Sequence, residues 1–145
     1  MSFDWDDYLR LAERLAEDAS KTGEEEAHLR SAVSRAYYAA FHKAEAHLRN
    51  VENDAKLIQR FRGNNKIIDE ETGGNIHKYV RKQFQRDMNV VRLQIASNLQ
   101  NLLDDRNIAD YDDVPVYQRK MKKKAGEVIA AAREVIEALA ALTGP

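Results

Sequence analysis

The stretch RSAVSRAYYAAFHKAEAHL, residues 30–48, decides the fold of this chain. Its apolar residues recur at intervals of three and four without a proline or glycine, which predicts one long helix. One sector of this helix carries the residues expected in the core: Val33, Tyr37, Ala40, Phe41, Ala44 and Leu48. A second face, nearly opposite and kept shallow by alanines, carries Arg35, Tyr38, His42, Ala39 and Ala46. A shallow, semi-apolar second face indicates that another helix, a second copy of the chain or a ligand packs there.

The rest of the chain has the same helical spacing. We expect helices over about 4–20, 25–51, 76–86, 89–104 and 116–142, with a short one near 55–61. The polar, glycine-containing segment at about 50–75 is predicted to be a long, partly mobile connection. The sequence RNIADYDDVP, residues 106–115, is predicted to be a turn-rich junction that ends at Pro115. The expected fold is all-α, a single domain over residues 1–145 built as an antiparallel bundle of four to five helices.

Composition limits the classes of function. The 145 residues correspond to one domain. The net charge of −1 is too small to attract nucleic acid or a membrane to the protein as a whole. The absence of cysteine excludes disulfides, thiolate metal sites and a cysteine nucleophile. The N-terminal residues are acidic and lack an apolar run, and no stretch has the ~20 apolar residues that a membrane span needs. We therefore expect a soluble, cytoplasmic protein that does not bind membranes.

Arg35 and His42 are the candidate catalytic residues. An imidazole titrates near neutrality and transfers protons, while a guanidinium binds phosphate through two parallel hydrogen bonds. The two residues are seven positions apart, about 10.5 Å along a helix, and His42 leans toward Arg35 while Arg35 leans away. A symmetric dimer with antiparallel central helices brings each Arg35 toward the partner's His42. The simpler alternative is a solvated face, or pairing with acidic residues of a neighbouring helix.

Two further groups of polar residues are candidates for supporting roles. Tyr38 and His77 are expected to support the cleft that Arg35 and His42 would form in such a dimer. A weaker hypothesis is that Lys78, Arg81 and Lys82, on the helix at 76–86, form a patch that binds an RNA backbone. The simpler alternative is that they lie on a solvated helix face. A structural lock is predicted to hold the fourth long helix against the last one through Arg106, Asp110 and Tyr111. No metal site and no cofactor are expected, because no zinc, phosphate-loop or nucleophile motif is present.

Several segments together resemble one known family. The stretch at 30–48 closely resembles the central helix of HEPN domains, and FDWDDYLRLAERL (3–15) resembles their opening helix. IHKYVRKQF (76–84) is similar to their mid-domain segment, LLDDRNIADYDD (102–113) to their arginine-x-x-alanine-aspartate-tyrosine stretch, and AGEVIAAAREVI (125–136) to their closing helix. The resemblance covers nearly the whole chain except 50–75.

This resemblance implies an HEPN-like bundle and a specific chemistry. Many members are metal-independent endoribonucleases, dimers built around an arginine and a histidine with four to six residues between them; Arg35 and His42 have six. The histidine would act as acid or base, the arginine would hold the phosphate, and the 2′-hydroxyl of single-stranded RNA would attack. Several members are toxins or phage-defence proteins, some beside a nucleotidyltransferase antitoxin.

The resemblance also leaves a second function open. Other members are non-catalytic modules that bind a nucleotide, an RNA or a partner protein. The position after the arginine is often polar in the nuclease members, and here it is Ala36. The alternative to a ribonuclease is therefore a binding module of the same fold.

Overall fold

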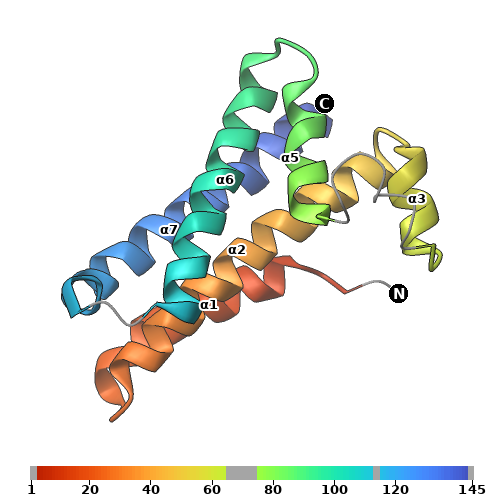
Figure 1. The fold of residues 1–145 in the computed structure, drawn as a ribbon. Coiled ribbons are helices and arrows are strands. Elements are labelled where there is room, and N and C mark those ends of the chain that lie inside the picture. The colour runs from red at the N-terminus through yellow and green to blue at the C-terminus, as the bar shows by residue number, and fades with distance from the viewer. Residues whose placement is uncertain (1–2, 65–74, 113–114, 144–145) are drawn as a thin grey trace.

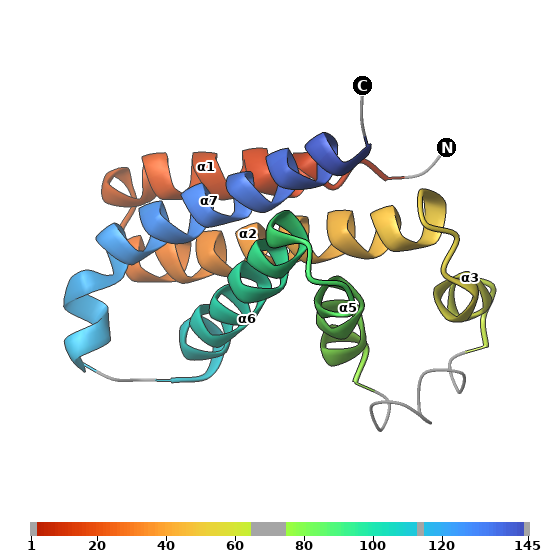
Figure 2. The same cartoon turned by 90° about the horizontal axis from the view of Figure 1, so that it is seen from above.

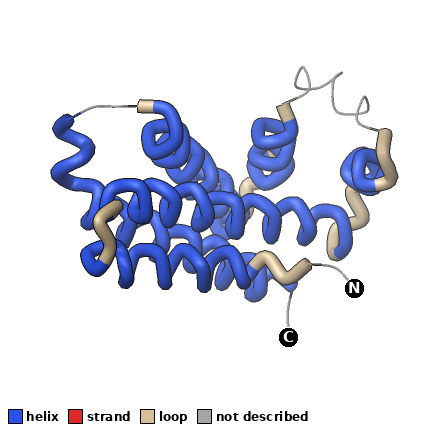
Figure 3. The backbone as a smooth tube through the Cα atoms, turned by 90° about the horizontal axis from the view of Figure 1, so that it is seen from below, coloured by secondary structure: helices blue, strands red, loops and turns tan. Residues whose placement is uncertain are grey.

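The described parts of the chain fold into helices. Residues 3–64, 75–112 and 115–143, which the computed structural model describes, contain helices and loops and no strand (Figure 3). The elements are α1 (Asp6–Asp18), the 3-10 turn η1 (Ala19–Lys21), α2 (Glu25–Asn50), α3 (Ala55–Phe61), α5 (Ile76–Gln85), α6 (Val90–Tyr111) and α7 (Pro115–Thr143), as drawn in Figure 1. The predicted all-α fold is confirmed.

Helix α2 is the central element, and it contacts all the other described helices. Figure 2 shows α1 and α7 on one side of α2, and α6, α5 and α3 on the other. The predicted core sector of α2 is buried throughout: Val33, Tyr37, Ala40, Phe41, Ala44 and Leu48. Leu99 and Leu102 of α6 and Val128 and Val135 of α7 complete the same core. A helix enclosed by several others has a wide buried face, which leaves little of α2 open.

The predicted second face of α2 is narrower than expected. Ala39 was assigned to it, but Ala39 is fully buried within the single chain. Trp5 and Tyr8 from the N-terminal segment are half-buried and cover part of this face. Ala39 is therefore a core residue, and it offers no surface to a second copy.

Within the described residues, α3, α5 and α6 begin at a side-chain cap. The carboxylate of Asp54, the amide of Asn75 and the amide of Asn89 accept hydrogen bonds from the backbone N–H groups of Leu57, Lys78 and Arg92. These caps fix where α3, α5 and α6 start. Asp54 also accepts a hydrogen bond from the Tyr79 hydroxyl of α5, at 3.0 and 2.9 Å to its two oxygens.

Helix α6 is longer than predicted, and RNIADY is its last part and not a turn. Arg30 of α2 explains the difference, because its Nη1 donates to the carbonyl oxygens of Ile108 (3.2 Å), Ala109 (2.9 Å) and Asp112 (2.6 Å). The last carbonyls of a helix lack partners within it, and a cation there is favourable. The prediction of a turn-rich junction was wrong for 106–111 because this cap comes from a distant segment.

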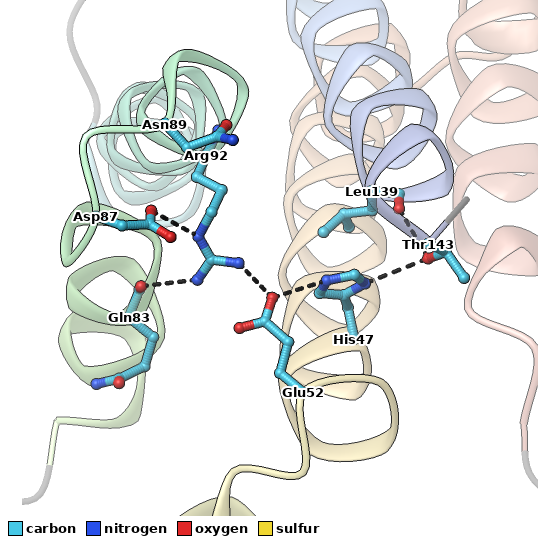
Figure 4. A network of polar contacts seen from close by, with 8 residues as sticks. All are labelled: His47, Glu52, Gln83, Asp87, Asn89, Arg92, Leu139 and Thr143. Atoms are coloured by element: carbon cyan, nitrogen blue, oxygen red, sulfur yellow. Dashed lines mark hydrogen bonds and ion pairs between the residues drawn. The ribbon is translucent and has the colours of Figure 1, made fainter. Parts of the chain in front are cut away.

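A polar network closes the end of the bundle where α2 finishes (Figure 4). Glu52 accepts from Arg92 and lies 2.9 Å from Nε2 of the buried His47. Arg92 also donates to the backbone oxygen of Gln83 at 2.9 Å, and His47 Nδ1 lies 3.4 Å from the Thr143 hydroxyl. The residues of this network are His47, Glu52, Gln83, Arg92 and Thr143. The network joins the end of α2 to α5, α6 and α7.

The polar connection predicted at 50–75 is described in part. Helix α3 occupies 55–61, where a short helix was expected, and Gly63 follows with a φ of 104°. Residues 65–74 lie outside the described residues. The consequence for function is the position of α3, which packs against α2 and carries Arg60 toward it.

Candidate active site

Helix α2 presents one stripe of partly exposed residues beside α1. The stripe contains Arg35, Tyr38, His42 and Arg49, which recur at multiples of three and four positions. The indole of Trp5 stacks on His42, with ring centroids 3.7 Å apart and planes at 13°. The guanidinium carbon of Arg35 lies 5.3 Å from the centroid of Tyr8. Trp5 and Tyr8 therefore hold the side chains of His42 and Arg35 on the side of the stripe that faces α1.

A cavity of about 340 Å³ opens beside His42. Aromatic and apolar side chains, two imidazoles and charged groups line it: Trp5, Tyr38, Phe41, His42, Glu45, Arg49, Arg60, Phe61, Ile76 and His77. A second cavity, of about 420 Å³ between α6 and α7, is lined by carboxylates, amides, Lys124 and apolar side chains and has no imidazole. Because an imidazole can both accept and donate a proton, the cavity at His42 is the candidate site.

His77 brings a second imidazole to this cavity from the first turn of α5. The Asn75 cap starts that helix, and the ring of His77 packs against Phe41 with centroids 4.4 Å apart. Its Nδ1 is hydrogen-bonded to the hydroxyl of Tyr37. Its Nε2 makes no hydrogen bond with any described residue and is not among their buried, unpaired atoms. One nitrogen of His77 is therefore held by the core, and the other is open to a ligand.

Burial and positive charge keep both imidazoles neutral. Burial, with a smaller effect of Arg60, lowers the pKa of His42 from 6.5 to about 4. Burial also lowers the pKa of His77 to about 4, with smaller effects of Arg106, Arg81, His42 and Arg60. Near pH 7 each ring is uncharged, so each has one nitrogen that accepts a proton and one that donates a hydrogen bond.

Arg60 lines the cavity and has no acidic partner among the described residues. It forms no ion pair and no hydrogen bond through its side chain with the described residues. Arg49, by contrast, is paired with the buried carboxylate of Glu45 at 2.9 and 3.2 Å. Nearby, Nη1 of Arg81 is buried without a hydrogen-bond partner. An unpaired guanidinium beside two neutral imidazoles is suited to binding an anion such as a phosphodiester.

The two residues predicted to be catalytic are not brought together within one chain's cavity. His42 lines the cavity, whereas Arg35 does not. Arg35 is half-buried against Tyr8, and its guanidinium makes no ion pair or hydrogen bond with the described residues. The sequence-based expectation that one chain has difficulty placing both groups on one phosphate agrees with this geometry.

A model of the HEPN domain family matches residues 5–142 of the chain. The chain belongs to the HEPN domain family. This family includes ribonucleases and non-catalytic members. No curated protein and no solved structure gives a significant match to the chain. Among the described helices of this HEPN domain, none is long and apolar enough to cross a membrane.

The predicted lock was expected to hold α6 against α7, but within the described residues the hydrogen bond that Arg106 of the HEPN domain makes outside α6 goes to α2. The Nε of Arg106 lies 2.9 Å from Asp110 Oδ2, which is the expected pair at four positions. Its Nη2 donates to the Tyr38 hydroxyl at 2.8 Å, and Asp110 accepts from Ser34 at 3.3 Å. Tyr111 is 72% exposed, and its ring lies 5.4 Å from the Arg106 guanidinium carbon. The lock therefore orients Tyr38 at the edge of the cavity.

The predicted basic patch on α5 is divided between two sides of that helix. Lys78 and Lys82 are exposed, while Arg81 is half-buried and close enough to Tyr37 and His77 to influence both pKa values. Arg81 therefore lies on the side of the helix near Tyr37 and His77, although it does not line the cavity, and the two lysines lie on the open side. No group of three or more His, Asp or Glu suited to a metal ion occurs among the described residues.

Sequence reasoning missed the contributions of Trp5 and Arg60 to the cavity of this HEPN domain. Nothing local marks Arg60, because its position depends on how the short α3 folds back onto α2. For Trp5 a signal was present. A large aromatic residue at the very start of an amphipathic helix, four positions from the core residue Leu9, often covers a neighbouring helix.

The lowered pKa values predict how stability depends on pH. Between pH 6.5 and 4, the unfolded chain binds protons at His42 and His77 that the folded chain does not, so stability falls as the pH decreases through this range. We expect thermal unfolding at pH 5 to occur on the order of 5 °C below that at pH 7. Replacing His42→Phe, which keeps a ring against Trp5, should reduce this difference by about half. An unchanged difference in the variant would show that other groups cause it.

Proposed function

We propose that this HEPN domain is a metal-independent endoribonuclease that cleaves single-stranded RNA. The observation that carries the proposal is the His42 imidazole, neutral and without a hydrogen bond to any described residue, in a cavity that also contains the unpaired guanidinium of Arg60. A neutral imidazole accepts a proton, and a guanidinium binds and stabilises a phosphate. Together they provide the two groups that cleavage of a ribose phosphodiester requires.

The proposed reaction uses the substrate's own nucleophile. His42 accepts the proton of the 2′-hydroxyl, the 2′-oxygen forms a bond to phosphorus, and the bond from phosphorus to the 5′-oxygen breaks. The 5′-oxygen takes a proton from water or from the imidazolium of His42. The products are a 2′,3′-cyclic phosphate and a 5′-hydroxyl, so atoms and charge balance. The arginines stabilise the extra negative charge at phosphorus.

The bound phosphodiester improves the base. The pKa of His42 is low partly because Arg60 is positively charged. A phosphodiester that binds between them brings a negative charge, which offsets that repulsion and raises the pKa toward neutrality. A base with a pKa nearer the working pH is more effective in proton transfer. A bound substrate therefore makes His42 a better base than it is in the empty cavity.

The second catalytic cation in the proposal is Arg35 of a partner copy. Arg35 is about 10.5 Å from His42 along α2 and is not committed to any described acidic residue. In a two-fold dimer with antiparallel α2 helices, each Arg35 approaches the other chain's His42, and the two cavities form one cationic cleft. Lys78 and Lys82, exposed on α5, extend that cleft along an RNA backbone.

The biological role that fits such an activity is a cytoplasmic toxin or defence effector. A ribonuclease that needs only its own side chains would cut the RNA of the cell that makes it unless a partner inhibits it. A nucleotidyltransferase-type antitoxin is the partner we propose. The alternative function is a non-catalytic module that binds a nucleotide, RNA or protein, and it is favoured by pKa values near 4, which make both imidazoles weak bases.

The test is cleavage in the presence of EDTA. We expect the purified protein to cleave a panel of single-stranded RNAs in excess chelator, with a 2′,3′-cyclic phosphate on each 5′ fragment. Mass spectrometry of the fragments identifies these ends. RNA that binds without being cut would support the binding module. Cleavage that chelation abolishes, or products with linear 3′-hydroxyl ends, would exclude the mechanism.

A further inference from the structure

His77 and Tyr37 form a pair that the arginine–histidine mechanism does not use. Tyr37 is 1% exposed, and burial raises its pKa, so its hydroxyl keeps its proton. The only hydrogen bond of that hydroxyl within the described residues is to Nδ1 of His77. If Tyr37 accepted from Nδ1–H instead, its own buried proton would have no acceptor, which is costly. The hydroxyl therefore donates, and Nδ1 is the acceptor.

This direction of donation fixes the tautomer of His77. In a neutral imidazole one nitrogen carries the proton and the other accepts. Because Nδ1 accepts from Tyr37, the proton of His77 is on Nε2. Nε2 is not buried and has no partner among the described residues, and His77 lines the cavity that contains His42. The cavity that contains the proposed base therefore also contains a fixed N–H donor.

We propose that His77 is a second catalytic residue of this site, which donates its Nε2–H to a non-bridging oxygen of the scissile phosphodiester, and that Tyr37 is the residue that positions it. The assignment rests on the proposed function and adds to it. His77 transfers no proton in this role: it donates a hydrogen bond to oxygens whose negative charge grows during the reaction. A neutral donor suits this position because burial, with smaller effects of Arg106, Arg81 and Arg60, disfavours an imidazolium there.

The chemistry of the surroundings supports a phosphate as the group that Nε2 meets. Arg60 lines the same cavity and has no acidic partner among the described residues, and Arg81, although outside the lining, is close enough to His77 to add positive charge there. The aromatic rings of Trp5, Phe41 and Phe61 provide flat, apolar walls for the sugar and base. An oxyanion with a nucleoside attached satisfies the cations, the N–H donor and the rings together.

The first experiment reads the tautomer without any need for activity. Long-range proton–nitrogen NMR spectra of the full chain at pH 7 should show His77 neutral, with its proton on Nε2. In Tyr37→Phe the same spectra should show a mixture of both tautomers. Wild-type protein with the proton on Nδ1 would overturn the assignment.

The second experiment adds a 2′-O-methyl oligoribonucleotide of mixed sequence, which lacks the nucleophile and is not cleaved. We expect it to shift the Nε2–H signal of His77 together with the signals of His42. A shift at His42 alone would overturn the role of His77 and leave the proposed function standing. A shift at neither ring would overturn both.

The third experiment separates donation from proton transfer. His77→Leu should lower kcat about 10²–10³-fold, as removal of an oxyanion donor does. His77→Gln retains an N–H donor and should stay within about tenfold of wild type, with the acidic limb of its pH–rate profile unchanged. Gln85→Leu, on the exposed side of the same helix, is the matched control. Equal rates for His77→Leu and wild type, or equally slow Gln and Leu variants, would contradict the proposal.

Discussion

His42→Phe is expected to lower the rate of RNA cleavage at least about 100-fold, the low end of the contribution that a general base makes. The phenyl ring preserves the stack on Trp5, whose centroid lies 3.7 Å from that of His42, but it has no nitrogen to accept the 2′-hydroxyl proton. The melting temperature at pH 7 should change by only a few degrees, because the apolar contact is retained. Initial rates on a fluorescent RNA and thermal unfolding measured on the same sample test both statements.

Arg35→Ala should give a comparable loss, through weaker stabilisation of the phosphate charge. Mixing the two inactive variants then tests whether the site is shared between copies. If each site takes Arg35 from one chain and His42 from the other, a mixed dimer has one intact site. Equal mixing should therefore restore about a quarter of wild-type activity, since about half of the dimers are mixed and each has one working site. No recovery after subunit exchange, with dimers present by light scattering, would show that both residues act from one chain.

Phe84→Ala is expected to cost about 3–5 kcal/mol of unfolding free energy, the usual loss when a buried aromatic ring is removed. Phe84 is 0% exposed, and its ring lies beneath the Arg92 guanidinium at 4.8 Å. A loss of this size lowers the melting temperature of a chain this long by about 10 °C or more. Urea unfolding followed by circular dichroism measures it.

Lys82→Ala is the matched control, because Lys82 lies two positions away on the exposed side of the same helix. Its unfolding free energy should stay within about 0.5 kcal/mol of wild type. Losses below about 1 kcal/mol in Phe84→Ala would mean that α5 contributes little to the stability of the bundle.

The core was predictable because its pattern is local. Val33, Tyr37, Phe41 and Leu48 fall on one side of any helix drawn through residues 30–48, and all four are buried. Ala39 was misplaced because a methyl group gives a weak periodic signal, and its burial depends on how closely neighbouring helices approach. The extension of α6 was missed because Arg30, far away in sequence, binds its last carbonyls.

The candidate site was predictable only in part. His42 and His77 were singled out from sequence, and both line one cavity. Arg60 and Trp5 were not, because their places depend on where α3 and the first residues pack on α2. The hydrogen bond from Tyr37 to His77 was also hidden, since a tyrosine in a core stripe gives no sign of what its hydroxyl meets.

The carboxylate of Asp54 limits which substitutions the sequence can accept at this position. It caps α3, which carries Arg60, and accepts the hydroxyl of Tyr79 on α5, which carries His77. Serine caps a helix well but is too short to replace both oxygens, and alanine loses both contacts. Substitutions at this position therefore disturb a cation and an imidazole at once. Because Arg60 and His77 line one cavity and are joined through Asp54, mutations at the two positions should be non-additive, and loss of Asp54 should weaken that coupling.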